Sequence, residues 1–138
     1  MSGRVMGQAS LQAVKGGVLT GCRKESRCWI LEFSGGITLE CYCPWRVVKN
    51  GAESKTLLGS RDLENERDPF PKLSLLLDGY EFSLIYFLPM HDSFKFGMNK
   101  GQERISIDIQ KDSAEDINWK IIGEDFEDSD QKRIIENL

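Results

Sequence analysis

The amino-acid sequence predicts a mainly β protein, in which antiparallel hairpins form a small sandwich or barrel with at most one or two short helices. Three observations lead to this fold class. Apolar and polar residues alternate along several short segments. Glycine-containing turns separate these segments. The chain of 138 residues, 40% hydrophobic and 29% charged, has the length and composition of one globular domain.

The first hairpin is expected over residues 28–43, around the turn Ser34-Gly35-Gly36. Its two strands share one apolar row, formed by Trp29, Leu31, Phe33, Ile37, Leu39, Cys41 and Cys43. The opposite row of the returning strand holds Thr38, Glu40 and Tyr42. Because successive side chains of a strand point to opposite faces, the apolar row is expected in the core and the other row outside it.

A second hairpin is expected over residues 73–87. Its outgoing strand would alternate through Leu73, Leu75 and Leu77, and Asp78-Gly79 is a strong two-residue turn signal. The returning strand alternates through Tyr80, Phe82, Leu84 and Tyr86. This hairpin would end in the middle of a sheet, because its far half is apolar on both faces.

Further strands are expected at 93–98 and 104–109, where Phe94, Phe96 and Met98 would face three isoleucines. A shorter pair, 45–48 and 55–58, flanks Asn50-Gly51. The segment before Pro69 and Pro71 has room for one helical turn at 62–66, and the prolines should bar any helix continuing through them. Residues 117–122 fit either a last strand or a short helix. These patterns predict roughly eight strands.

Charge divides the chain into a single β-rich domain at 1–123 and an acidic C-terminal tail at 124–138. Residues 112–138 hold nine Asp and Glu against three Lys and Arg. We expect residues 123–133 to be solvated. An acidic tail on a near-neutral body argues against nucleic-acid binding, which needs a concentrated basic surface. It favours a basic protein partner.

The N-terminal segment lacks the apolar run of a signal peptide, and no stretch is long and apolar enough for a membrane helix. We therefore expect a cytoplasmic protein that contacts no membrane. In that compartment Cys22, Cys28, Cys41 and Cys43 should be reduced thiols buried as small core residues. Their spacing is wrong for zinc knuckles.

No catalytic, cofactor or metal site is predicted. His91 is the single histidine and lies in no recognisable nucleophile motif, so we interpret it as a loop residue. The tail from Asp125 to Glu136 has the acidic spacing of a calcium loop, but its sixth position, which requires glycine, is Asp130. Phosphate-binding loops are also absent from the sequence.

The predicted partner-binding residues fall in two places. Trp45 and Arg46 stand side by side at a strand end, and both residue types are enriched among interface hot spots. The alternative is that Trp45 caps the core while Arg46 is solvated. The second group is acidic and would attract a basic partner. It comprises Glu124, Asp125, Glu127, Asp128 and Asp130.

Three segments carry a resemblance to a known family. They are the run from Phe33 to Glu40, the triplet Pro44-Trp45-Arg46, and the run from Leu58 to Asp62. Over roughly the first half of the chain, they resemble small bacterial all-β domains, some of which act as immunity proteins beside toxins. The resemblance implies a non-catalytic inhibitor that occludes a toxin, and it implies no catalytic residues.

The leading hypothesis is a non-catalytic protein-binding module, such as an immunity protein that neutralises a basic toxin. The alternative is a small-ligand-binding β-barrel in which Phe82, Tyr86, Phe94 and Phe96 line a cavity. A hydrolase that uses His91 is a third reading. The sequence leaves open a homodimer, since an unpaired sheet edge can be capped by a second copy.

Overall fold

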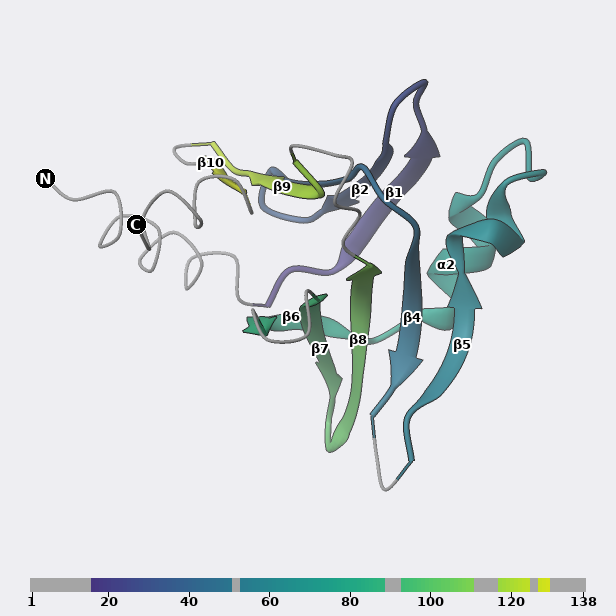
Figure 1. Ribbon diagram of the computed structural model, residues 1–138. Helices are drawn as coiled ribbons and strands as arrows, with labels where there is room; N and C mark the ends of the chain where they lie inside the picture. Colours follow the sequence, from purple (N-terminus) through teal and green to yellow (C-terminus); the bar gives the residue numbers. More distant parts are fainter. Residues whose placement is uncertain (1–15, 51–52, 89–92, 111–116, 125–126, 130–138) are drawn as a thin grey trace, which may run out of the picture.

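The computed structural model describes residues 16–50, 53–88, 93–110, 117–124 and 127–129 (Figure 1). The side chains of 84–88, 93, 94 and 110 are not described. The elements, in chain order, are β1 (Leu19–Lys24), β2 (Trp29–Phe33), β3 (Ile37–Cys41), β4 (Trp45–Lys49), β5 (Lys55–Gly59), the 3-10 helix η1 (Ser60–Leu63), α2 (Phe70–Leu76), β6 (Glu81–Leu88), β7 (Ser93–Lys100), β8 (Glu103–Gln110), β9 (Trp119–Ile122) and β10 (Glu127–Ser129).

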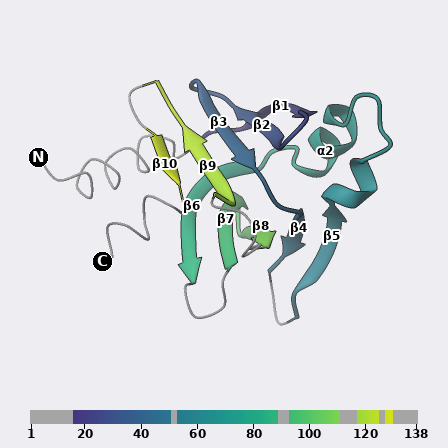
Figure 2. The ribbon, with the colours of Figure 1, turned by 45° about the horizontal axis from the view of Figure 1, so that its top comes forward.

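The strands form two antiparallel sheets of five strands each. Sheet A has the order β1-β2-β3-β9-β10, and sheet B has the order β5-β4-β8-β7-β6. Among the described strands neither sheet closes on itself, so the protein is a small β-sandwich and the predicted mainly β class is confirmed. Figures 1 and 2 show the two layers, and helix α2 contacts β1 of sheet A.

One hydrophobic core fills the space between the sheets, and both sheets contribute their apolar rows to it. Edge-to-face aromatic contacts join the two sheets, a geometry that adds about 0.5–1.5 kcal/mol per pair beyond burial. The ring centroids of these pairs lie 5.6 Å apart for Trp29 and Trp45, 6.3 Å for Phe33 and Phe82, and 5.4 Å for Phe96 and Trp119.

Three of the four predicted hairpins fold as expected; the one over 73–87 does not, and its return strand, β6, lies at the edge of sheet B rather than in the middle. In the β2–β3 hairpin the turn uses Gly35 and Gly36 at φ of 82° and 75°, a left-handed conformation that favours glycine. In the β7–β8 hairpin, register pairs Phe96 with Ile107 and Met98 with Ile105, as the alternation indicated. The predicted pair 45–48 and 55–58 is confirmed as β4 and β5, and residues 51–52 of their connection lie outside the described residues.

The predicted strand over 73–77 is wrong, because these residues belong to helix α2. Prolines are tolerated in the first turn of a helix, and here Pro69 is the N-cap and Pro71 follows within that turn. Leu73 and Leu77, four residues apart, are 0% and 3% exposed, whereas Leu75 is 83% exposed. That spacing is helical. Strand β6 pairs with β7 instead of with residues 73–77.

The acidic tail was also expected to be solvated, but two of its described residues, Asp128 and Ser129, are buried. Residues 127–129 form β10, which pairs with β9 at the edge of sheet A. Asp128 and Ser129 are 4% and 8% exposed. The segment 117–122, left open between strand and helix, contains strand β9 between β3 and β10. The sequence analysis did not predict β1, which pairs with β2.

Candidate functional site

Trp45, a predicted partner contact, lies inside the sandwich. It is 2% exposed, its ring packs against that of Trp29, and its backbone N–H donates to Ser60 Oγ at 3.2 Å. The alternative reading of Trp45 as a residue that caps the core is therefore the correct one. A partner cannot reach this side chain without opening the sandwich.

The other predicted contacts fall on different sheets. Arg46 is exposed on the outer face of sheet B, whereas Glu124 and Glu127 are exposed at the β9–β10 edge of sheet A. Asp128 is buried on the core side of β10, opposite Ile121. Asp125, Asp130 and His91 lie outside the described residues. The structure therefore does not unite the predicted residues into one surface.

The outer face of sheet A brings together a mixed set of acidic, aromatic and aliphatic side chains. We use this name for the residues that alternate with the core row across five strands, which are Arg23, Ile30, Glu32, Thr38, Glu40, Tyr42, Lys120, Ile122 and Glu127. Ile30 is 5% exposed near its middle. Most of the surrounding side chains are half-buried, so the face is a packed, flat surface.

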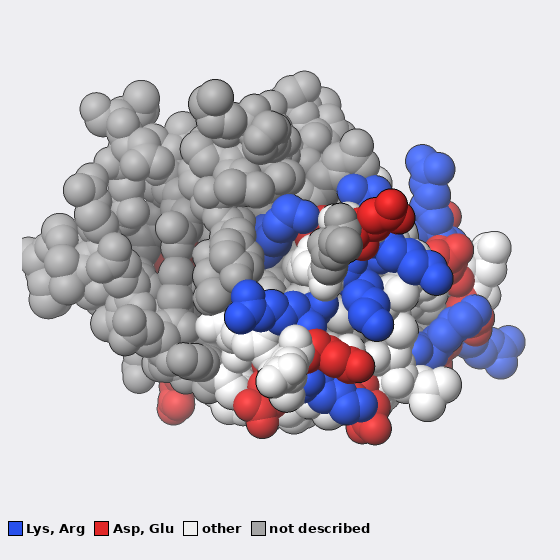
Figure 3. Space-filling view, turned by 90° about the horizontal axis from the view of Figure 1, so that it is seen from below, with Lys and Arg blue, Asp and Glu red and all other residues white. Residues whose placement is uncertain are grey.

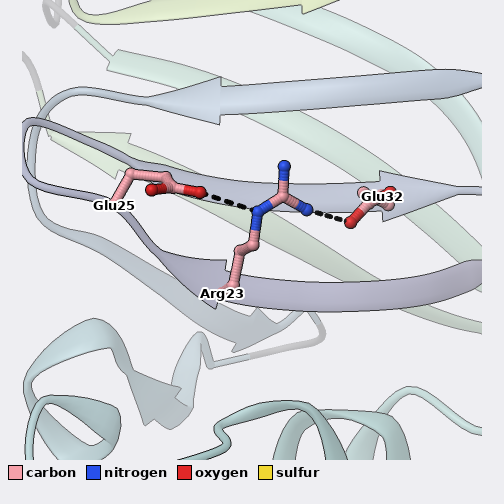
Figure 4. Close-up of polar contacts among 3 residues, drawn as sticks. All are labelled: Arg23, Glu25 and Glu32. Carbon is pink, nitrogen blue, oxygen red and sulfur yellow. Dashed lines mark hydrogen bonds and ion pairs between the residues drawn. The ribbon is translucent and has the colours of Figure 1, made fainter.

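At the β1 edge of this face, Arg23 is neutralised by two glutamates (Figure 4). Its Nε donates to Glu25 Oε1 at 2.8 Å, and its Nη1 donates to Glu32 Oε1. Gly21 makes room for Glu32, since a Cβ at Gly21 would lie 3.0 Å from Glu32 Oε1. These charges are mostly exposed, so water screens the pairs and they contribute little to stability.

On β3, the central strand of sheet A, Glu40 keeps an unneutralised carboxylate. Register places Glu40 directly opposite Lys120, but the Lys120 ammonium pairs with Glu127 at 3.1 Å. Within the described residues Glu40 makes no ion pair and accepts a hydrogen bond from the Tyr42 hydroxyl at 2.6 Å. Burial and the Glu40 carboxylate raise the pKa of Tyr42, so this phenol stays protonated and donating.

Sequence reasoning missed Glu40 and Tyr42 as site residues, although the signal was present. The period-two pattern had already placed both on the row opposite the core. Tyrosine is enriched among interface hot spots because its ring offers apolar area and its hydroxyl a hydrogen bond. Tyr42 is the aromatic residue of the row opposite the core, and this position in the pattern indicates a surface contact more directly than the neighbouring Trp45-Arg46 pair does.

The four cysteines are free thiols in the structure, and three of them are buried. Burial raises the pKa of Cys22 to about 12 and raises the pKa of Cys41 well above its ordinary value. Cys43 Sγ donates to Asn118 Oδ1 at 2.6 Å. Within the described residues no group of three or more histidine, cysteine or acidic side chains is placed to hold a metal ion.

We expect the buried thiols to make stability decline at alkaline pH. The thiol pKa of Cys22 rises from 9.0 to about 12 on folding, so the folded protein holds this proton more tightly than the unfolded chain does. The free energy of unfolding should therefore fall above pH 9, by about 1–2 kcal/mol for Cys22 up to pH 11. Urea denaturation at a series of pH values measures this.

The variant Cys22→Ala is the control for the alkaline effect. Its stability should be lower at pH 7, because a buried sulfur is lost, but it should decline less steeply above pH 9. An unchanged slope would contradict the assignment of the effect to Cys22. Half-buried Cys28 should be alkylated by iodoacetamide before the three buried thiols are.

The strands do not form the barrel on which the ligand-binding alternative depends. In that alternative Phe82 and Phe96 line a cavity, but their rings pack 6.4 Å apart in the core, where both residues are buried. The side chains of Tyr86 and Phe94 are outside the described set. No helix in the described residues is long and apolar enough to cross a membrane.

The protein is therefore a small, mainly β sandwich, and the outer face of its sheet A carries acidic, aromatic and aliphatic side chains. Comparison of the chain with protein-family models, with curated protein sequences and with solved structures gave no match.

Proposed function

We propose that this protein is a non-catalytic protein-binding module that binds a basic partner through the outer face of sheet A. The observation that carries the proposal is the Glu40 carboxylate, which has no ion pair within the described residues and is held by the Tyr42 hydroxyl at 2.6 Å. A half-buried carboxylate beside an aromatic ring suits an arginine or lysine side chain.

The surrounding charges support a basic partner. Glu25, Glu32 and Glu127 lie around the face and Glu124 is exposed beside it, whereas the cations there are Arg23, Lys120 and, at the β1–β2 end, Lys24 and Arg27. Arg23 and Lys120 are already paired with carboxylates, so the part of the face around Glu40 and Glu124 is the acidic part. The negative potential of this part accelerates the association of a basic protein and makes it sensitive to salt.

The resemblance noted for the first half of the chain extends the proposal to a cytoplasmic immunity protein whose partner is a basic toxin. In that role the module would act by covering the toxin rather than by chemistry. The acidic residues Glu124 and Glu127, predicted from the sequence as partner contacts, would form the rim of the binding surface.

A capture experiment with matched variants tests this function. Tagged protein retrieves partners from the native lysate at low salt, and each partner is then purified and its affinity measured against defined variants. Glu40→Gln, which removes the charge and keeps an acceptor for Tyr42, should weaken binding about tenfold. Tyr42→Ala should weaken it by at least as much, because the ring is lost as well.

Glu64→Gln is the matched control, because Glu64 is an exposed glutamate that follows η1 and does not belong to the outer face of sheet A. It should leave the affinity unchanged within about twofold, as expected for a charge outside the contact. A partner that binds wild type and Glu40→Gln equally would reject the outer face of sheet A as the binding site. If the capture recovered a stoichiometric small molecule and no protein, the proposal that this protein is a protein-binding module would be rejected.

A further inference from the structure

Lys120 lies between two carboxylates on the outer face of sheet A and pairs with one of them. On one side, β3 places Glu40 directly opposite Lys120. On the other side, β10 places Ser129 directly opposite Lys120, and Glu127 diagonally from it. The Lys120 ammonium lies 3.1 Å from Glu127 Oε1, and Glu40 has no ion pair within the described residues. Figure 2 shows β3, β9 and β10 side by side, with β10 at the edge.

Both carboxylates are within reach of the Lys120 side chain. Directly opposed residues of a sheet have Cβ atoms about 5 Å apart, and diagonal neighbours are about 7–8 Å apart, which long side chains can bridge. Lysine carries a compact ammonium on a long flexible stem, so its charge can move between the two positions without any change in the backbone. The side chain is 25% exposed, so part of this movement takes place in solvent.

The pKa values of two neighbouring side chains show that the three charges act on the same part of the face. Burial and Glu40 raise the pKa of the Cys28 thiol, whereas Lys120 acts to lower it. Burial and Glu40 also raise the pKa of Tyr42, and Glu127 adds to this rise. Lys120, Glu40 and Glu127 therefore all lie within electrostatic range of the Cys28 and Tyr42 end of the face.

Cations beside carboxylates are common on this protein, but Lys120 differs from the others in how it is held. Figure 3 shows the end of the molecule where the hairpins of sheet B turn, and Lys and Arg side chains lie there among Asp and Glu side chains. Arg23 contacts Glu25 and Glu32 at the same time. The two carboxylates beside Lys120 lie instead on separate strands, and one of these, β10, has three residues and pairs only with β9 among the described strands.

We infer that Lys120 alternates between Glu127 and Glu40, and that Glu127 is a positioning residue of the partner-binding face. While Glu127 holds the Lys120 ammonium, the Glu40 carboxylate stays open to a cation of the partner. When β10 leaves β9, Lys120 pairs with Glu40 and closes the site. The inference rests on the proposed function and adds its regulation. Because coupling between two equilibria is reciprocal, a bound basic partner should also hold β10 on β9 more firmly.

The two positions of Lys120 are close in free energy. The Glu127 side chain is 59% exposed, and ion pairs at exposed positions are weak. Glu40 is half-buried, and one of its oxygens already accepts a hydrogen bond from Tyr42. The populations of the two positions should therefore differ by about twofold to fivefold. A difference of this size makes the exchange reversible, as a regulatory contact requires.

Zero-length crosslinking tests the exchange without a partner. A water-soluble carbodiimide joins a lysine amine to an adjacent carboxylate as an amide, and mass spectrometry identifies the joined peptides. In wild type, Lys120 should be joined mainly to Glu127. In Glu127→Gln, the yield of the Lys120–Glu40 amide should rise about threefold. Glu124→Gln removes a nearby exposed charge and should change that yield by less than about 1.5-fold.

A binding experiment tests whether Glu127 acts through Lys120. The probe is a fluorescent peptide of alternating arginine and serine, about six residues long, and fluorescence anisotropy gives its affinity. Glu127→Gln should weaken peptide binding about threefold, which is more than Glu124→Gln does. In a Lys120→Gln background the effect of Glu127→Gln should fall to that of Glu124→Gln, because no ammonium is left to pair with Glu40. Circular dichroism and thermal unfolding check that the variants fold.

Two results would overturn the inference. The yield of the Lys120–Glu40 amide could be the same in Glu127→Gln as in wild type. Glu127→Gln could also weaken peptide binding equally with and without Lys120, which would make Glu127 a direct contact of the peptide. Failure of the proposed function gives a different result, in which the peptide binds wild type no more tightly than Glu40→Gln, whatever amide the crosslinking yields.

Discussion

Replacing Phe96 with alanine is expected to lower the free energy of unfolding by about 3–5 kcal/mol, the range measured for large aromatic residues removed from cores. Phe96 is 0% exposed. Its ring lies 5.4 Å from that of Trp119 on the other sheet and 6.4 Å from that of Phe82. The substitution therefore leaves a cavity where the two sheets meet, and urea denaturation measures the loss.

Leu75→Ala is the control for Phe96→Ala, since Leu75 is 83% exposed on α2. It should change stability by no more than about 0.5 kcal/mol. A loss below about 1 kcal/mol for Phe96→Ala would mean that the core repacks easily, contrary to the close packing of protein interiors. It would also weaken the assignment of Phe96 as a contact between the sheets.

The second large effect is expected at Asp108. Asp108→Ala should cost about 2–4 kcal/mol, because it removes the acceptor of two hydrogen bonds and leaves Lys95 without its partner. The Lys95 side chain is 29% exposed, so water compensates part of the loss. Arg46 stands directly opposite Asp108, and its repulsion with Lys95 adds to the cost.

A double-mutant cycle separates the ion pair from the packing. Lys95→Met alone should be milder than Asp108→Leu alone, and the double variant Lys95→Met with Asp108→Leu should recover much of the stability, because matched apolar residues replace both charges. Thermal unfolding of the four proteins gives the coupling energy. Additive effects would show that Lys95 and Asp108 do not interact in solution.

The outer faces of the two sheets share one physical pattern. In each sheet, a charged residue stands directly opposite a residue of the other sign but does not pair with it, because the opposing group is occupied by a third residue. Lys120 is engaged by Glu127, which leaves Glu40 unpaired, and Asp108 is engaged by Lys95 and Ser106, which leaves Arg46 unpaired. Unsatisfied charges of this kind are available to partners at low reorganisation cost.

Local sequence patterns determined much of the sandwich. Alternation and glycine turns determine β2 with β3 and β7 with β8, because side-chain direction in a strand has a strict period of two. The same pattern separates the row containing Leu39 from the row containing Glu40 and Tyr42. The sequence therefore predicts that Glu40 and Tyr42 lie on the outer face of the sheet, but it does not single them out as candidate partner-binding residues.

Only the tertiary structure decided the remaining features, because each depends on contacts between residues far apart in the chain. The leucines at 73, 75 and 77 fit a strand or a helix by spacing alone, and burial of Leu73 and Leu77 against the core selects the helix. Residues 127–129 look like a solvated acidic segment until pairing with β9 makes them a strand. Trp45 and Arg46 are neighbours in sequence, but the position of sheet A decides that one is core and the other surface.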